Sequence, residues 1–312
     1  MTKVYIDGSA GTTGLRIYER FAGRADTELL TIAPELRKDA AERARMINSS
    51  DITFLCLPDD AAREAVAMVT NPEVRIIDTS TAHRTNPEWC YGFAELSPAH
   101  RAALTAGKRV SVPGCHASGF IAIVYPLVKA GLMPKDYPAV CYSVTGYSGG
   151  GKKMIEQYQS ADRDSELDAP RQYALKQKHK HLPEMQAVTG LDYAPIFSPI
   201  VADYYSGMTV TVPLHTRLLC GSATPDSVRE LLAKHYKGQP LVRVLDSEPE
   251  TGFIGSNNLS GKDYMEITVS GNEDRILIAS RFDNLGKGAS GAAIQCMNIM
   301  LGLDETTGLQ AD

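Results

Sequence analysis

The sequence predicts an α/β protein of two domains: a Rossmann-like, doubly wound domain, then an α+β domain with a mainly antiparallel sheet. Three observations predict this fold. The length of 312 residues is typical of two domains. Short apolar runs alternate with helical patterns up to about residue 114, and longer runs of alternating polarity follow from about residue 135.

The first domain is expected over residues 1–114. Its apolar runs of strand length lie at residues 3–7, 28–33, 52–57, 74–78 and 109–113. Helical patterns lie between them at residues 39–47, 61–69 and 97–105, and Asp59 or Asp60 is expected to cap the second. Strands that alternate with helices favour a parallel sheet with helices on both faces.

The second domain is expected over residues 115–284. Its strand patterns lie at residues 139–145, 196–202, 208–213 and 241–245. Residues 264–270 and 275–282, joined by Gly-Asn-Glu-Asp, predict a hairpin. Residues 286–301 carry small residues on one side and predict a tightly packed terminal helix.

Composition narrows the possible functions. The net charge of −5 gives no basic surface for nucleic acid and no polybasic segment for a membrane. No apolar run is long enough for a transmembrane helix, and no secretory leader is expected before the first strand. Six scattered cysteines without a CxxC motif favour free thiols in a reducing cytoplasm.

A glycine-rich turn follows the first strand and opens a helical pattern at residues 15–21. Its spacing is GxxGxxG, with Ala10 where the dinucleotide-binding fingerprint GxGxxG has its second glycine. Small residues at a helix N-terminus still let the backbone approach a pyrophosphate. The residues expected to bind the cofactor here are Gly8, Gly11, Thr12, Thr13 and Gly14. The alternative is a tight turn that needs glycine without any ligand.

The end of the second strand indicates which cofactor is used. An NAD site usually has an acidic residue there, whereas this chain has Ala33-Pro34 at the strand end, followed by Glu35 and then by Arg37 and Lys38. Two cations suit a 2′-phosphate, so NADP(H) is the expected cofactor. The alternative is that both side chains are simply solvated.

Cys115 is the candidate nucleophile. It lies in Val-Pro-Gly-Cys-His-Ala-Ser-Gly, between a strand pattern at residues 109–112 and an apolar helical pattern at residues 120–132. The positive end of a helix favours a thiolate, and the unpaired backbone N–H groups there could hold an oxyanion.

The segment Lys-His-Lys-His-Leu-Pro-Glu supplies candidate acid/base groups. If residues 179–181 are extended, His179 and His181 point to one face, with Glu184 one turn into a helix. An imidazole can serve as base for a thiol, with a carboxylate fixing its tautomer. Zinc would need a third nearby ligand, so no metal is expected. The histidines expected to be ordinary surface or satisfied polar residues are His83, His100, His215 and His235.

Residues 146–153, Gly-Tyr-Ser-Gly-Gly-Gly-Lys-Lys, end a strand and enter a helical pattern. Backbone amides such as that of Gly149, together with Lys152, would make an anion site, although the spacing does not match a P-loop. A flexible surface turn is the alternative.

These motifs together resemble one family. The chain resembles the shorter subclass of the N-acetyl-γ-glutamyl-phosphate reductases, within the wider aspartate-semialdehyde dehydrogenase group, over essentially its whole length. The motifs that carry the resemblance are GSAGTTG (8–14), PGC (113–115), YSGGGKK (147–153), HKHLPE (179–184), YYSGM (204–208) and DNLGKGASGAAIQCMNIMLG (283–302). The glycine turn, the cysteine loop and the YSGGGKK loop depart from the longer subclass.

The resemblance implies the NADPH-dependent reduction of an acyl phosphate to an aldehyde in arginine biosynthesis. Cys115 would attack N-acetyl-γ-glutamyl phosphate and expel phosphate, and hydride transfer to the thioester would give N-acetylglutamate semialdehyde, reversibly with phosphate. His181 matches the family's acid/base residue, and His179 and Glu184 match its supporting partners.

The resemblance also implies substrate contacts and an assembly. Asn284 matches a position near the nicotinamide, so the terminal segment 285–312 would return to complete the first domain. Arg84 matches an active-site arginine. With Gly149, Lys152 and His179 it is expected to bind the substrate. A homo-oligomer is implied, a tetramer packed through the sheet of the second domain.

Four alternatives stay open at this stage. Aspartate-semialdehyde dehydrogenase uses the same chemistry, but the HxHxxE segment and the DNLxKG tail argue against it. A reductase for a carrier-linked aminoadipyl phosphate would need a surface for an acidic carrier, which this acidic chain does not suggest. A cysteine hydrolase would not need the glycine turn. A non-catalytic NADP-binding protein would not need both Cys115 and the histidine segment.

Overall fold

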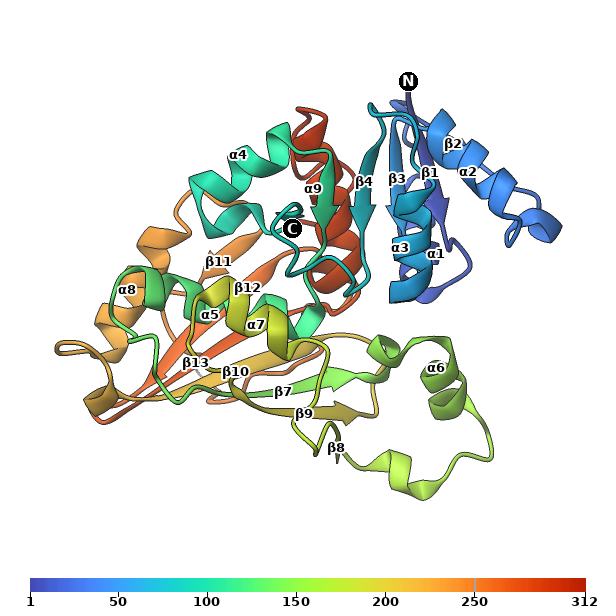
Figure 1. Ribbon diagram of the computed structural model, residues 1–312. Helices are drawn as coiled ribbons and strands as arrows, with labels where there is room; N and C mark the ends of the chain where they lie inside the picture. The colour runs from blue at the N-terminus through green and yellow to red at the C-terminus, as the bar shows by residue number, and fades with distance from the viewer. Residues whose placement is uncertain (250) are drawn as a thin grey trace. The chain divides into compact units, whose positions relative to one another are not determined.

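The computed structural model describes residues 1–249 and 251–312 and divides the chain into two compact units (Figure 1). The first unit comprises Met1–Pro113 and Ala289–Leu309, and the second comprises Gly114–Gly288 and Gln310–Asp312. The terminal segment expected in the first domain is therefore divided, because residues 285–288 and the last three residues belong to the second unit.

The first unit contains a six-stranded sheet in the order β2-β1-β3-β4-β6-β5, and every neighbouring pair is parallel. The strands are β1 (Thr2–Asp7), β2 (Thr27–Leu30), β3 (Ile52–Leu55), β4 (Arg75–Asp78), β5 (Cys90–Tyr91) and β6 (Arg109–Ser111). The parallel sheet predicted from the alternating pattern is confirmed. β5 was not predicted, since two residues carry no periodic signal.

Helices cover both faces of this sheet, as expected for a doubly wound domain (Figure 1). They are α1 (Thr12–Arg20), α2 (Ala40–Ser49), α3 (Asp59–Ala67), α4 (Pro98–Ala106) and α9 (Gly291–Met300). Ile17 of α1 and Met297 of α9 belong to one core cluster, and Ile47 of α2 and Ala65 of α3 belong to the other. Since neighbouring side chains of a strand point to opposite faces, each cluster covers one face.

Two details of the first unit differ from the sequence-based expectations. α3 begins at Asp59 after Pro58, so the expectation that Asp59 or Asp60 caps it is wrong. The Asp59 carboxylate instead accepts hydrogen bonds from the backbone N–H and the hydroxyl of Thr81. β2 ends at Leu30, three residues before the end of the expected run, and a 3₁₀ turn, Pro34–Leu36, follows that run.

The second unit contains a seven-stranded sheet in the order β11-β12-β13-β10-β7-β9-β8. The strands are β7 (Val140–Gly146), β8 (Arg171–Gln172), β9 (Ile196–Ala202), β10 (Met208–His215), β11 (Val242–Val244), β12 (Met265–Gly271) and β13 (Arg275–Phe282). The predicted hairpin is the antiparallel pair β12–β13. Two neighbouring pairs, β7–β9 and β11–β12, are parallel, so the sheet is mixed although mainly antiparallel.

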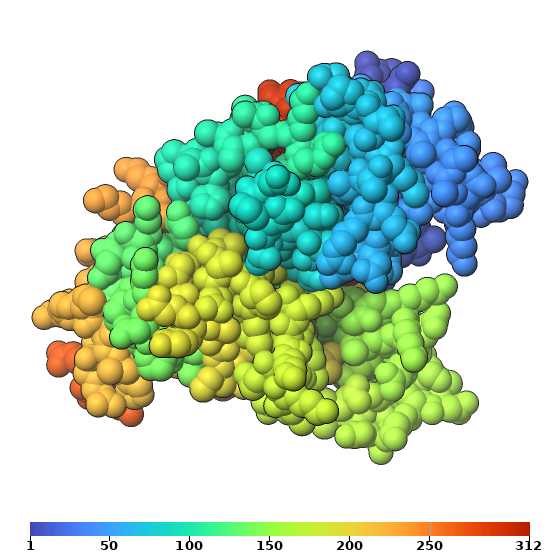
Figure 2. All heavy atoms as spheres, viewed as in Figure 1, coloured from blue at the N-terminus to red at the C-terminus, as the bar shows by residue number. Residues whose placement is uncertain are grey.

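Helices α5 (Cys115–Lys129), α6 (Gly151–Gln159), α7 (Leu182–Thr189) and α8 (Pro225–His235) belong to the second unit. α5 lies so close to the sheet that a Cβ at Gly119 would stand 2.5 Å from a methyl of Val210 and 2.6 Å from the Ser280 hydroxyl. α8 was not predicted from the sequence. α6 and the turns around it, light green in Figure 2, form an outer lobe of this unit.

Candidate active site

Cys115 is the first residue of α5, which begins there and not at residue 120 as the apolar pattern predicted. Gly114 is the N-cap, and its backbone N–H donates a 2.8 Å hydrogen bond to Oε1 of Glu184. Glu184 lies in the first turn of α7 and is buried. The contact thus joins the helix start that carries the cysteine to the helix that follows the histidine segment.

Three of the other cysteines are poor candidates for a nucleophile. Burial raises the pKa of the Cys56 thiol to about 12, and it also raises the pKa of Cys90 and of Cys141. A raised pKa leaves little thiolate at neutral pH. Cys115 is half-buried and stands at the positive end of a helix, where a thiolate is favoured.

His179 and His181 lie together, but not in the expected way. His181 is the N-cap of α7 with φ −87° and ψ −14°, a helical conformation, so the condition that residues 179–181 be extended is not met. A turn in which the Leu182 N–H donates to the His179 carbonyl brings the two rings to a centroid separation of 4.8 Å.

Sequence reasoning missed His116, which the structure places beside both histidines. Its ring centroid lies 5.9 Å from that of His179 and 5.5 Å from that of His181. Nδ1 is 2.6 Å from the Ser143 hydroxyl, and Nε2 is 2.7 Å from the Tyr173 hydroxyl. Burial lowers the pKa of His116 to about 3. The available signal was a polar residue in the first turn of an almost wholly apolar helix.

Asn284 joins two loops of the second unit. Its Nδ2 donates to the Ser148 hydroxyl at 3.0 Å, and its Oδ1 accepts from the Gly207 N–H at 2.9 Å. A Cβ at Gly149 would stand 3.3 Å from Asn284 Nδ2, so these two predicted site residues are neighbours. Lys152 instead lies on the exposed side of α6, 3.9 Å from a carboxylate oxygen of Glu156.

Gly288 packs against Cys115, the candidate nucleophile. It lies in a turn of π-helix, Gly286–Ser290, in which its N–H donates to the Asp283 carbonyl at 2.9 Å. A Cβ added at Gly288 would stand 2.9 Å from the Cβ of Cys115, closer than two such atoms can come. The glycine is therefore needed for close packing against Cys115, which the sequence pattern could not indicate.

The glycine-rich turn of the first unit has the geometry of a phosphate cradle. Gly8 has φ +88°, and a Cβ there would stand 2.3 Å from the Cys56 carbonyl oxygen, so only glycine fits. Gly11 is the N-cap of α1, and Thr12 and Thr13 are its first residues. Their N–H groups lie at the positive end of the helix, where a pyrophosphate binds in related turns.

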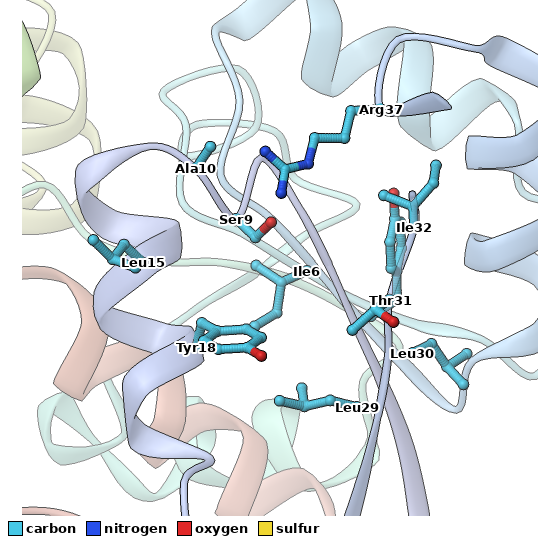
Figure 3. Close-up of a pocket in the computed structure, with 11 residues that line it drawn as sticks. Ile6, Ser9, Ala10, Leu15, Tyr18, Leu29, Leu30, Thr31, Ile32 and Arg37 are labelled. Carbon is cyan, nitrogen blue, oxygen red and sulfur yellow. The ribbon is translucent and has the colours of Figure 1, made fainter. Parts of the chain in front are cut away.

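A pocket of about 270 Å³ lies beside this turn (Figure 3). It is lined by Tyr5, Ile6, Ser9, Ala10, Leu15, Tyr18, Leu29, Leu30, Thr31, Ile32 and Arg37. The guanidinium of Arg37 extends toward Ser9 and Ala10. Lys38 is exposed and is not among the described residues that line the pocket. Arg37 is thus the better placed of the two cations for a 2′-phosphate.

Arg84 lies at the carboxyl end of the parallel sheet, where open α/β sheets bind ligands. It is buried, and it donates from Nε to the Val112 carbonyl at 2.9 Å and from Nη2 to the Thr79 carbonyl at 3.0 Å. The neighbouring His83 is also buried, with Nδ1 2.7 Å from the Asp78 carboxylate and its ring stacked on Trp89. His83 is therefore a satisfied polar residue.

The described residues contain neither a metal-binding cluster nor a membrane-spanning helix. Within residues 1–249 and 251–312, no group of three or more His, Cys, Asp and Glu side chains could hold a metal ion. In the same part of the chain, no helix has the length and apolar character needed to cross a membrane.

Two family models match the chain. One describes the NAD binding domain of semialdehyde dehydrogenases and matches residues 3–104; the other describes their dimerisation domain and matches residues 115–284. Together with the parallel sheet, the glycine turn and the cysteine at a helix start, these matches define the chain as a semialdehyde dehydrogenase-type oxidoreductase.

Curated relatives narrow the family further. A protein from Sinorhizobium fredii, "N-acetyl-gamma-glutamyl-phosphate reductase", is 48% identical over 96% of this chain and 98% of its own. "N-acetyl-gamma-glutamyl-phosphate reductase 2" from Nostoc is 43% identical over 98% of this chain and 99% of its own. The chain belongs to the N-acetyl-γ-glutamyl-phosphate reductase family.

Solved structures agree on the fold. "Aspartate Semialdehyde Dehydrogenase from Francisella tularensis" matches with a TM-score of 0.72 at 15% identity, over 96% of this chain and 100% of that one. Aspartate semialdehyde dehydrogenase II from Vibrio cholerae, complexed with ASA, matches with a TM-score of 0.71 at 13% identity, over 97% of this chain and 98% of that one. At such low identity these likenesses concern the fold alone.

The first prediction concerns the hydrogen bond between Glu184 and the Gly114 N–H. Glu184→Ala removes the acceptor and leaves a buried N–H unpaired beside Cys115, so we expect kcat to fall by about 100-fold through misplacement of the nucleophile. Glu184→Gln retains an oxygen acceptor and should lose only about 10-fold. Steady-state turnover measures both. Glu230→Ala, on the exposed side of α8, is the control. Full turnover by Glu184→Ala would disprove the role.

The pocket beside the glycine turn generates a second prediction. Arg37→Ala should weaken NADP binding by about 10- to 100-fold, the usual worth of charge-assisted hydrogen bonds to phosphate, and leave NAD binding unchanged. Lys38→Ala is the matched control and should change NADP affinity by less than about 3-fold. Titration calorimetry with each nucleotide tests this. An equal loss of NAD and NADP affinity would contradict a 2′-phosphate contact.

The buried histidines generate a third prediction. Burial lowers the pKa of His116 to about 3 and that of His179 to about 4, against 6.5 for a free imidazole. The unfolded chain therefore binds more protons below pH 6.5, and stability falls as the pH drops from there toward 4. His116→Phe should reduce this decline by up to about 1.4 kcal/mol per pH unit, measured by urea unfolding. The exposed His215→Gln should retain the wild-type slope. A wild-type slope in His116→Phe would refute the assignment.

Proposed function

We propose that this protein reduces N-acetyl-γ-glutamyl phosphate to N-acetylglutamate 5-semialdehyde with NADPH, a step of arginine biosynthesis. The observation that carries the proposal is Cys115 at the start of α5, next to the histidine cluster and tied through Gly114 to Glu184. The family membership supports the substrate.

Cys115 is the nucleophile of the proposed reaction. Its thiolate attacks the γ-carbonyl carbon of the acyl phosphate, an S–C bond forms, and the C–O bond to phosphate breaks as inorganic phosphate leaves. Backbone N–H groups in the first turn of α5 stabilise the oxyanion that develops on the carbonyl oxygen. The product of this half-reaction is a thioester on Cys115.

His181 is the acid/base residue of the proposed reaction, and Glu184 and His179 support it. After reduction, His181 donates a proton to the thiohemiacetal oxygen and takes it back as this intermediate collapses. The C–S bond then breaks, and the aldehyde leaves with the Cys115 thiolate restored. Burial lowers the pKa of His179 to about 4, so this neighbour stays neutral and adds no positive charge beside His181.

NADP(H) is the cofactor, and the first unit has residues that fit it. When bound, NADPH supplies the hydride that reduces the thioester. The N–H groups at the start of α1, with Gly8, Gly11, Thr12, Thr13 and Gly14, would hold the pyrophosphate. Arg37 would hold the 2′-phosphate, with Lys38 adding charge nearby. Asn284 would lie near the nicotinamide.

The substrate carries a phosphate and a carboxylate, and both need cationic or amide partners. Arg84 is our candidate for one of them, because its guanidinium is fixed by the carbonyls of Thr79 and Val112. The Gly149 amide is a second candidate, with Lys152 and His179 at the margin of the substrate site.

The matched dimerisation domain and the open face of the second sheet support self-association. α5 packs on the face that carries Val210 and Ser280, while Tyr142, Ile196 and Leu277, at outward positions of β7, β9 and β13, are exposed. Apolar side chains on an open sheet face are typical of a subunit interface. We propose a tetramer built through this sheet and residence in the cytoplasm, where thiols stay reduced.

The reaction is tested in reverse. The purified protein is given NADP and either N-acetylglutamate semialdehyde or aspartate semialdehyde, each with and without phosphate, and NADPH is followed by absorbance. We expect phosphate-dependent turnover of the N-acetyl substrate alone, and loss of turnover with retained NADP binding in Cys115→Ser.

Turnover of aspartate semialdehyde instead would move the protein to the sister activity. Turnover without phosphate would contradict an acyl-phosphate product. If neither aldehyde is oxidised while NADP still binds, the proposed activity is wrong.

A further inference from the structure

The imidazole of His116 is buried, and both of its ring nitrogens are paired. It is 3% exposed, and both ring nitrogens have a hydroxyl partner, Nδ1 at 2.6 Å from Ser143 and Nε2 at 2.7 Å from Tyr173. One tautomer satisfies both contacts when one hydroxyl donates and the other accepts.

The two partners of His116 belong to different parts of the second unit. Ser143 lies on β7, in the middle of the sheet, and Tyr173 directly follows β8 and begins the segment that leads to His179 and His181. The ring therefore joins three structures: the start of α5, the sheet, and the segment that carries the acid/base histidine.

That segment is held in an uncommon conformation. Ala174 and Gln177 have positive φ angles of 55° and 52°, which residues with a Cβ rarely adopt. The Gln177 side-chain amide makes two hydrogen bonds to the backbone of Phe197: its Nε2 donates to the carbonyl at 2.8 Å, and its Oε1 accepts from the N–H at 2.9 Å. Strained backbone of this kind persists where its surroundings hold it and is common near active sites.

His116 also limits where the other rings can lie. The ring of His181 is 5.5 Å away and tilted by 50°, and that of His179 is 5.9 Å away and nearly perpendicular. Phe197 closes another side at 5.3 Å. Because these rings share one buried cluster, a change in the orientation of His116 would move His181.

The charge state of His116 suits this position. Its surroundings include Tyr173 and His179, with His181 beside them, and Cys115 precedes it in the chain. Burial is the largest cause that lowers the pKa of His116, to about 3, so the ring is neutral under working conditions. A neutral neighbour leaves His181 able to take up a proton without repulsion.

We propose that His116 is a positioning residue for the Cys115–His181 pair, acting through its bond to Tyr173. It follows the nucleophile in sequence and orders the acid/base segment, without itself touching the substrate. This inference rests on the proposed function, because the pair it positions is the one assigned there.

Three variants separate the two contacts. In His116→Gln the terminal amide stands where Nε2 was and can bond Tyr173, whereas in His116→Asn it stands where Nδ1 was and can bond Ser143. His116→Phe keeps a ring and loses both contacts. His100→Gln is the control, since His100 also bonds a serine hydroxyl, that of Ser97 at 2.8 Å.

Two readouts are measured on each folded variant: turnover in the reverse reaction, and the rate at which iodoacetamide alkylates the Cys115 peptide across a range of pH. We expect His116→Phe to lose about 100-fold in kcat, the size of effect that a small misplacement causes. We also expect slower alkylation of Cys115 with a shifted pH profile. His116→Gln should recover kcat to within about 5-fold of wild type, the worth of one hydrogen bond.

Three results would overturn the inference: wild-type kcat in His116→Phe, a loss of kcat with lowered Tm but an unchanged alkylation profile, or rescue by His116→Asn and not by His116→Gln. The alkylation readout needs no substrate. If the wild-type protein fails to oxidise N-acetylglutamate semialdehyde while the variants still differ in alkylation as expected, the proposed function fails and the role of His116 stands.

Discussion

The hydrogen bond from the Gly114 N–H to the Glu184 carboxylate is the contact on which the rest of the site depends. Helix starts leave N–H groups without partners, and here one of them is paired with a buried carboxylate from another helix. The bond fixes the start of α5, and with it Cys115, relative to α7, and His181 caps that second helix. One interaction thus positions the proposed nucleophile and the proposed acid/base residue together.

Two of the three histidines near this contact, His116 and His179, carry no positive charge at neutral pH. His116 and His179 both have a pKa lowered by burial, so two of the three clustered imidazoles stay neutral at physiological pH. Gly288 contributes space, because any side chain there would collide with Cys115. The site therefore combines the proposed nucleophile at a positive helix end, the proposed proton carrier His181 and close packing around Cys115. These are the requirements of a thioester mechanism.

Sequence patterns that depend on neighbouring residues, such as apolar runs and alternating polarity, predicted much of the fold. Apolar runs gave the central strands of the parallel sheet, and β12 and β13 followed from their alternation and the turn between them. β5 and β8 escaped prediction because two residues carry no period. The cap of α3 was misassigned because Asp59 bonds Thr81, far along the chain. Motifs brought Cys115, His181 and Glu184 to notice, but not His116, Tyr173 or Gly288, whose importance lies in contacts between distant segments.

The central claim is that Cys115 forms the covalent intermediate. The most direct measurement mixes the protein with N-acetyl-γ-glutamyl phosphate in the absence of NADPH, quenches it in acid and maps the acylated peptide by mass spectrometry. We expect an N-acetylglutamyl thioester on the Cys115 peptide, one per active subunit, which disappears when NADPH is added before the quench. An acyl group on a different residue, or no adduct while the same sample turns over with NADPH, would contradict it.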